Sequence, residues 1–275
     1  MYKFSQSGFR ISILLATYNW PSALHLCLES LREQTDLNFE IIIADDGSND
    51  VTKELINEIS SNFPVSITHL WQEDHGFRKS KILNLAIQSA TGDYLIFLDG
   101  DCIVQPDFVA QHRRLARPSK LITGSRILLS KQLTENLCPP LQSSAQSAQV
   151  IKKLFSKTDF LIGLLKLRLM GEINKLLPLL IKLPNHPYRV YPAHVWKRIK
   201  GCNMSCWRSD ALQINGLDES FEGWGHEDAD FVFRLEDLGV QRISGSFATE
   251  VLHLWHKTQP SDQEHINRER VLSRI

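Results

Sequence analysis

The chain has 275 residues, 43% hydrophobic and 23% charged, a composition typical of a folded protein with one large domain or two small ones. Basic and acidic residues number 31 each, so the formal net charge of zero gives no global electrostatic case for nucleic-acid binding. The sequence shows neither a signal peptide nor a membrane-spanning apolar run, and the five scattered cysteines argue against a disulfide framework. We therefore expect a cytoplasmic protein.

Strand-like and helix-like segments alternate over the first hundred residues. Apolar runs predict strands at 10–16, 39–44, 65–71 and 92–98. Helices are expected at 23–34, from Asn49 or Asp50 to Ile59, and at 80–90, with Ser22 as the cap of the first. This alternation is typical of an α/β fold with a mostly parallel central sheet flanked by helices.

Polar side chains collect where these strands end. They are Thr17, Tyr18 and Asn19, then Asp45 and Asp46, then His75 and Arg78, and finally Asp99 and Asp101. In open α/β sheets the carboxyl ends of the strands form the ligand site, so the pattern indicates a nucleotide site. There is neither a dinucleotide fingerprint nor a P-loop motif. The phosphates would therefore be held by a metal and by Arg78 or Lys81.

Asp99 and Asp101 follow the fourth strand and are separated only by Gly100. Two carboxylates this close repel each other unless a positive charge lies between them. A divalent cation that prefers oxygen ligands would supply that charge. Gly100 would let the backbone turn so that both side chains face one point.

Taken together, Ala16-Thr17-Tyr18-Asn19, Asp45-Asp46-Gly47-Ser48 and the stretch from Gly92 to Asp101 resemble a family 2 glycosyltransferase with the GT-A fold. The resemblance implies that Asp101 is the main metal contact, assisted by Asp99, and that the metal is Mn²⁺ or Mg²⁺. It also implies a set of residues that bind the donor nucleotide. These are Thr17, Tyr18, Asn19, Asp46, Arg78, Asp99 and Gly100.

The middle of the chain is less regular. We expect a helix at 106–117 and a strand at 121–129, followed by a helical insert over 131–200. The part at 149–183 is rich in Leu and Ile, with seven basic residues against two acidic ones. The favoured interpretation is an insert whose apolar face packs on the domain. The alternative is a basic amphipathic surface that rests on a membrane or on a lipid-linked acceptor.

A second group of candidate residues follows residue 201. Glycines flank Trp224 in a predicted loop, and Glu227 and Asp228 fall in the first turn of a helix expected at 227–238, which Gly239 stops. Strands are expected at 241–243 and 247–251.

The stretch Trp224-Gly225-His226-Glu227-Asp228 resembles galactosyltransferases and N-acetylgalactosaminyltransferases, including the bacterial chondroitin-polymerase type. The resemblance implies that Asp228 is the catalytic base and that Glu227 and Trp224 bind the acceptor. It further implies that His253 completes the metal site, with His256 as a rival.

The whole sequence therefore predicts one GT-A domain, with a nucleotide-sugar half at 10–130, the insert at 131–200 and an acceptor half at 201–275. The expected activity is metal-dependent, inverting transfer of a galactose-, N-acetylgalactosamine- or glucose-type sugar from a UDP-sugar to a glycan hydroxyl. A role in bacterial surface polysaccharide or lipopolysaccharide synthesis, with peripheral membrane contact through 149–183, is expected from the resemblance. The alternatives are a nucleotidyltransferase and a non-catalytic nucleotide-sugar-binding module.

Overall fold

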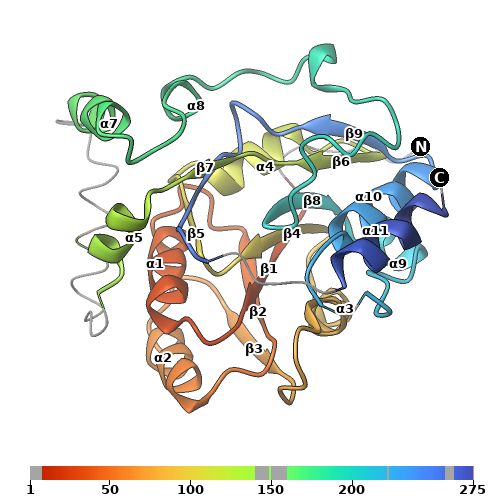
Figure 1. Ribbon diagram of the computed structural model, residues 1–275, viewed down its shortest axis with the longest axis horizontal. Coiled ribbons are helices and arrows are strands. Elements are labelled where there is room, and N and C mark those ends of the chain that lie inside the picture. The colour runs from red at the N-terminus through yellow and green to blue at the C-terminus, as the bar shows by residue number, and fades with distance from the viewer. Residues whose placement is uncertain (1–7, 140–148, 150–159, 222, 258–262, 275) are drawn as a thin grey trace.

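The computed structural model describes residues 8–139, 149, 160–221, 223–257 and 263–274, and its centre is a seven-stranded sheet (Figure 1). The strand order is β3 (Ile67–Trp71), β2 (Phe39–Asp45), β1 (Ile11–Thr17), β4 (Tyr94–Asp99), β8 (Asn203–Trp207), β6 (Lys120–Thr123) and β9 (Gln241–Ser244). Only β8 runs against its neighbours β4 and β6. The expected mostly parallel α/β sheet is confirmed, but β8 as a strand inserted between β4 and β6 was not anticipated.

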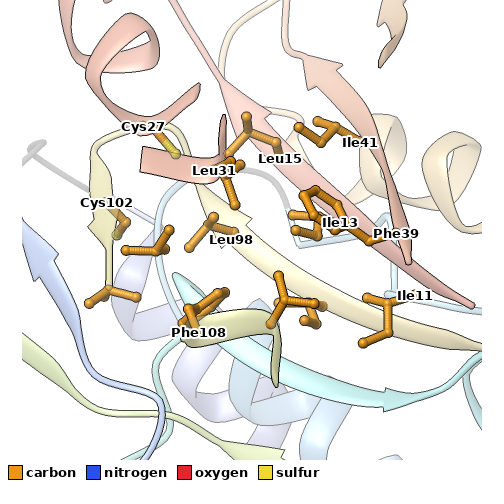
Figure 2. Packing of buried hydrophobic residues seen from close by; sticks show 14 of the residues in the cluster. Ile11, Ile13, Leu15, Cys27, Leu31, Phe39, Ile41, Leu98, Cys102 and Phe108 are labelled. Carbon is orange, nitrogen blue, oxygen red and sulfur yellow. The ribbon is translucent and has the colours of Figure 1, made fainter. Parts of the chain in front are cut away.

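Side chains from the central strands alternate between the two faces of the sheet. Ile11, Ile13 and Leu15 of β1 join the first apolar cluster, whereas Leu14 and Ala16 join the second. The first cluster is covered by α1 (Pro21–Arg32), α2 (Asp50–Ser60) and α4 (Phe108–Leu115), and Figure 2 shows its packing. The second is covered by α3 (Lys79–Ser89), α9 (Arg208–Gln213), α10 (Glu227–Asp237) and α11 (Glu264–Leu272). Because both faces are covered, β1, β2 and β4 are largely apolar. Among the buried exceptions, Ser12 of β1 and Glu40 of β2 form a hydrogen bond with each other at 2.5 Å.

The starts of the first two helices test the expected caps. Helix α1 begins at Pro21, with Trp20 as its N-cap, so Ser22 lies inside the helix and the prediction that it is the cap was wrong. Proline is well suited to the first helical position because its missing N–H has no partner there in any case. Helix α2 is capped by Asn49, whose side chain accepts a hydrogen bond from the Val51 N–H.

A small second sheet lies beside the first, in the order β5 (Cys102–Val104), β10 (Val251–His253) and β7 (Arg126–Leu128). The single strand expected at 121–129 is therefore divided between two sheets. The break falls at Gly124, where an added Cβ would lie 2.2 Å from the Asn203 side chain. The strand expected at 247–251 was also wrong, because Phe247 adopts a left-handed φ of 59° and pairing begins only at Val251.

The insert contains α5 (Lys131–Leu137), α7 (Phe160–Leu169), α8 (Leu177–Leu180) and a short 3₁₀ turn at Pro187–Arg189, and part of the predicted 149–183 segment lies outside the described residues. Leu164 and Leu179 pack into a third apolar cluster with the small sheet. Ile162 and Leu169 instead expose 73% and 78% of their surface. Packing on the domain thus accounts for only part of the apolar surface. Among the helices that the structure describes, none has the length and apolarity to cross a bilayer.

Candidate active site

The turn after β2 is fixed by Asp45, and this leaves Asp46 facing the sheet edge. Asp45 is fully buried, accepts the Ser48 N–H at 2.8 Å and lies 3.0 Å from His69 Nε2. The Asp46 N–H donates to the Thr17 carbonyl at 3.0 Å, which ties the end of β1 to the turn. The structure therefore separates a structural aspartate, Asp45, from a candidate ligand-binding one, Asp46.

Asp46 is held by groups from the loop before α3. Its carboxylate accepts the Arg78 N–H at 2.8 Å and the Gln72 amide at 2.5 Å. Burial raises the pKa of Asp46, while these two hydrogen bonds oppose the increase. The Arg78 guanidinium bonds to the Glu73 carbonyl at 2.5 Å, and its buried Nε has no hydrogen-bond partner among the described residues. Arg78 and Asp46 thus form one unit, as a shared donor-binding role would require.

Tyr18 and Asn19 border the same edge. The Tyr18 hydroxyl donates to Asp74 at 2.8 Å, and half of this residue is exposed. Asn19 has a left-handed φ of 45°, and it connects the loop after β1 to Ser48 and Asn49 through hydrogen bonds of 2.9 and 3.0 Å. Every residue expected to contact the nucleotide therefore lies along the carboxyl ends of neighbouring strands.

Gly100 is required by the close approach of β1. Its N–H donates to the Ala16 carbonyl at 2.7 Å, and an added Cβ would stand 3.1 Å from that oxygen. Asp99, immediately before it, pairs with Lys79 Nζ at 2.5 Å. The turn between the two aspartates is thus narrow, and its first carboxylate is already neutralised.

Lys79 is a site residue that the sequence analysis missed. The sequence indicated Arg78 or Lys81 as the cation for the phosphates. Lys81 is exposed on α3, whereas the Lys79 side chain is largely buried against Asp99. Burial alone would lower the pKa of Lys79, but the charges of Asp99 and Glu227 outweigh burial and raise it. The lysine therefore carries a fixed positive charge at the sheet edge. Its position next to Arg78 was the only signal in the sequence.

Asp101 lies beside both candidate histidines. Its Oδ2 is 3.7 Å from His253 Nε2 and 3.3 Å from His256 Nε2, so the two are neighbours at one carboxylate. Burial lowers the pKa of His253, which favours the neutral form that binds metals. The His253 Nδ1 lies 2.9 Å from the Leu254 carbonyl, and a hydrogen bond there would leave Nε2 free to face Asp101. One ligand atom from each of these three residues lies within 4.8 Å of the others.

A second group with metal-ligand character shares His253. Cys102 and Cys202 are buried, and their sulfurs and one His253 nitrogen also lie within 4.8 Å of one another. Cys102 Sγ is 3.5 Å from Asp101 Oδ1. Thiolates suit softer metals, whereas a carboxylate with imidazoles suits Mn²⁺. The cluster of Asp101, His253 and His256 therefore fits the expected metal better, and Asp99 stands outside it in its ion pair with Lys79.

The expected base lies at the start of α10. Asp228 accepts the Gly201 N–H and the Ala229 N–H, both at 2.8 Å. The residue after Gly201, Cys202, accepts the Asp99 N–H at 3.4 Å through its carbonyl. Two consecutive residues thus connect Asp228 to the aspartate turn after β4.

Glu227 is buried, and its Oε2 has no hydrogen-bond partner in the described part of the chain. Burial, and then the neighbouring charge of Asp228, raise the pKa of Glu227 to about 7, while Lys79 opposes them. A carboxyl group with this pKa changes its charge near neutral pH. Such a group in a cleft is typical of functional sites.

The loop before α10 contains three residues with positive φ angles. Gly223, Gly225 and His226 have φ values of 73°, 116° and 70°. Trp224, between the two glycines, exposes 42% of its surface. The Gly223 N–H reaches the Phe77 carbonyl at 3.4 Å, and the two loops line a pocket of about 310 Å³ together with Arg78 and Arg270. The acceptor-side loop thus lies against the donor-side loop.

We expect Glu227→Gln to stabilise the protein at pH 8 more than at pH 5. The glutamate is protonated in both states below pH 4.5, and between pH 4.5 and about 7 the unfolded chain loses this proton first. Stability of the wild type therefore falls as pH rises through that window, by up to about 3 kcal/mol. A neutral amide of equal size avoids this cost. Urea unfolding at both pH values measures the difference.

Glu269→Gln, on an exposed position of α11, is the matched control and should change stability equally little at both pH values. An equal effect of Glu227→Gln at pH 5 and pH 8 would contradict the raised pKa of Glu227.

Comparison with known proteins agrees with this geometry. Residues 12–133 match the model of glycosyl transferase family 2, and residues 188–257 match that of the N-terminal domain of galactosyltransferase. Chondroitin synthase of Escherichia coli is 26% identical over 94% of this chain and 36% of its own length. The chain spans between 36% and 52% of the length of the first curated relatives it matches.

Solved structures show the same fold. A mannosyltransferase from Pyrobaculum calidifontis, in complex with GDP-Man and Mn²⁺, superposes with a TM-score of 0.60 at 16% identity, covering 96% of this chain and 62% of that one. GalNAc-T7 with UDP, GalNAc and Mn²⁺ gives a TM-score of 0.62 at 16% identity, covering 96% and 48%. The two segments matched by the family models contain the aspartate turn after β4, the start of α10 and both candidate histidines. The chain therefore has the GT-A fold, with a family 2 glycosyltransferase segment at residues 12–133 and a galactosyltransferase-type segment at residues 188–257.

Proposed function

We propose that this enzyme transfers a sugar from UDP to a hydroxyl group of a glycan acceptor, with inversion at the anomeric carbon and with a bound divalent metal. The observation that carries the proposal is the link between Asp99 and Asp228. Their partners are the carbonyl of Cys202 and the N–H of Gly201, which are consecutive in the chain. A donor held at the aspartate turn and a base at α10 would therefore face the same space.

Asp101 and His253 are the proposed metal ligands, and His256 is able to replace or join His253. Asp99, whose carboxylate pairs with Lys79, would contribute to the metal site through a bridging water. The donor set of one carboxylate and two imidazoles fits Mn²⁺ better than Mg²⁺, which prefers oxygen ligands. When bound there, the metal supplies positive charge that stabilises the departing nucleotide diphosphate. Lys79 adds a second, permanent positive charge beside it.

Thr17, Tyr18, Asn19, Asp46, Arg78 and Gly100 would hold the nucleotide end of the donor. Glu227 and Trp224 would position the acceptor. Asp228 would then remove the proton from the acceptor hydroxyl as its oxygen attacks the anomeric carbon. The bond from that carbon to the diphosphate oxygen breaks in the same step, so one displacement inverts the configuration and no protein nucleophile is needed.

The galactosyltransferase match over residues 188–257 favours a galactose-, N-acetylgalactosamine- or glucose-type sugar. The similarity to a chondroitin synthase favours a bacterial surface polysaccharide or lipopolysaccharide as the product. The fold alone does not select the nucleotide, because one structural neighbour holds GDP-Man and another holds UDP.

A panel of UDP- and GDP-sugars tests the proposal, with Mn²⁺ present, release of free nucleotide as the readout and Asp101→Ala as the control. Turnover of one UDP-sugar that disappears in the variant would support the proposal and identify the sugar. Tight Mn²⁺-dependent UDP binding without turnover would indicate that a specific acceptor is needed. Absence of both UDP binding and turnover would contradict the proposal.

The insert is the proposed site of peripheral membrane contact. Ile162, Leu165 and Leu169 lie along one side of α7 with 73%, 48% and 78% of their surfaces exposed, and Lys166 and Arg168 lie between them. Exposed apolar side chains can enter a lipid surface, and neighbouring basic ones are attracted to its anionic headgroups. Figure 1 shows α7 at the periphery of the fold, away from the central sheet.

We expect the protein to float with vesicles that contain anionic lipid, and the triple variant Ile162→Ser, Leu165→Ser and Leu169→Ser to lose at least about tenfold of this binding. The double variant Leu37→Ser and Val51→Ser removes exposed apolar side chains elsewhere and should float like the wild type. Equal flotation of the triple variant and the wild type would exclude α7 as the contact.

A further inference from the structure

A pocket of about 640 Å³ lies between the β6–β7 turn and the insert. It is lined by five cationic side chains and one carboxylate. The cations are Arg126, Arg168, Lys175, Arg198 and Lys200, and the carboxylate is Glu250. None of the residues proposed to bind the nucleotide lines it, so the pocket is separate from the donor edge.

In the described part of the chain, the five cations of this pocket outnumber its single carboxylate. Within the described residues, none of the five cations forms an ion pair with a carboxylate. Lys175 donates to the Arg126 carbonyl at 3.0 Å and to the Ser125 hydroxyl at 3.4 Å, and Arg198 donates to the Tyr191 hydroxyl at 3.5 Å. Glu250 is buried and accepts the Phe247 N–H at 2.5 Å. Cations collected without partners raise the local concentration of anions.

The pKa of Lys175 reflects its burial and the proximity of the other positive charges in the pocket. Burial lowers its pKa, and the charges of Arg198 and Arg126 lower it further, while Glu250 opposes them. Arg198 itself has a left-handed φ of 66°, a conformation that is uncommon outside glycine. Like charges held together at a strained position are a feature of ligand sites rather than of a solvated face.

The residues that line the pocket lie next to both the proposed metal cluster and the proposed base. Arg126 Nη1 lies 3.4 Å from His253 Nε2, at the metal cluster. Lys200 precedes Gly201, whose N–H binds Asp228, at the base. Asn203 Nδ2 joins the two sides by donating to the Ser125 carbonyl at 3.1 Å. A molecule in this pocket would therefore approach the reacting centre from the acceptor side.

We propose that this pocket binds an anionic group of the acceptor, a phosphate or a carboxylate. The inference rests on the proposed transferase function and adds the chemical class of the acceptor to it. Arginine and lysine side chains recognise both anions through charge-assisted hydrogen bonds. Leu176, Leu177 and Phe247 form an apolar part of the wall, next to α8, which suits a sugar face or a hydrocarbon attached to the anion.

The test is calorimetric binding of two probe pairs to the enzyme saturated with UDP and Mn²⁺, so that no probe can occupy the donor site. One pair is methyl β-glucuronide and methyl β-glucoside, which differ by a carboxylate. The other is geranyl phosphate and geraniol, which differ by a phosphate. We expect the charged member of at least one pair to bind about tenfold or more tightly than its neutral twin, and this preference to decrease with added salt.

The double variant Arg168→Gln and Arg198→Gln should reduce this preference to within about twofold, because it removes two exposed cations of the pocket without touching the metal or the base. Arg268→Gln, on an exposed position of α11 outside the pocket, should preserve the preference. A preference in the glucuronide pair identifies a carboxylate, and one in the geranyl pair identifies a lipid phosphate.

The failures of the two proposals are distinguishable. If UDP does not bind the wild type with Mn²⁺, the transferase proposal fails. If UDP binds and neither charged probe is preferred, the anionic pocket is overturned, and the same holds if the preference survives in the double variant.

Discussion

Replacing Asp228 by asparagine is expected to lower kcat for sugar transfer at least about a hundredfold, while the Kd for UDP with Mn²⁺ changes by less than about threefold. Asparagine cannot take the proton from the acceptor hydroxyl, so the loss should fall on the chemical step. The nucleotide edge is formed by the end of β1, the turns that follow β1, β2 and β4, and the loop before α3, and Asp228 belongs to none of them. Nucleotide binding should therefore be preserved.

The variant also has a structural cost that must be measured. Each carboxylate oxygen of Asp228 accepts one backbone N–H, from Gly201 and from Ala229, and asparagine can satisfy only one of them. Loss of one such bond should cost about 1–3 kcal/mol of stability. Asp237→Asn, at the exposed end of the same helix, is the matched control and should retain both activity and stability. Equal losses of UDP binding and transfer in Asp228→Asn would show that the residue supports the fold rather than the chemistry.

Glu227 is the competing base, since its orphaned carboxylate oxygen and raised pKa are what proton transfer near neutral pH requires. The kinetic assay that tests Asp228→Asn separates the two. If Glu227 positions the acceptor, Glu227→Gln should raise the acceptor KM more than it lowers kcat. A hundredfold loss of kcat in Glu227→Gln, together with an active Asp228→Asn, would transfer the role of base to Glu227.

The sheet core was predictable because buried parallel strands are short apolar runs that local patterns reveal. Predicted strand boundaries were wrong where the backbone conformation depends on a residue distant in the sequence. Gly124 divides the strand expected at 121–129 because the Asn203 side chain, nearly 80 residues away, occupies the space of its Cβ. No local pattern contains that contact. Strand β8 was missed for the same kind of reason, since its pairing with β4 and β6 is made by folding alone.

The candidate site follows the same division. Motifs placed Asp46, Asp101 and Asp228, whose spacing from neighbouring residues is a property of the sequence. Lys79 was missed because its pairing with Asp99 depends on how α3 is oriented against β4. The choice between His253 and His256 was framed as one ligand or the other, whereas the turn after β10 brings both to Asp101. Sequence spacing identifies candidate site residues, and tertiary packing determines which of them lie close together.

Replacing Asp101 by alanine is expected to abolish Mn²⁺-dependent UDP binding and to reduce transfer at least about a hundredfold. Asp101 is the residue on which the metal-competent cluster is centred, because its Oδ2 faces both histidines. The fold should tolerate the change, since the backbone contact of Asp101, from its carbonyl to the Leu254 N–H at 3.0 Å, does not involve the side chain. Titration of Mn²⁺ by electron paramagnetic resonance measures the loss directly.

Single histidine variants then show how the cluster is used. The Nδ1 atoms of His253 and His256 both lie beside a backbone carbonyl, at 2.9 and 3.1 Å. His253 is buried, whereas the His256 side chain is 42% exposed and retains more rotamer freedom. Preorganised ligands contribute more to affinity, so His253→Ala should weaken Mn²⁺ binding by about tenfold or more, and His256→Ala by less. The reverse order would make His256 the ligand and His253 its support. Unchanged Mn²⁺ affinity in both variants and in Asp101→Ala would place the metal elsewhere, and the role proposed for this aspartate would then be wrong.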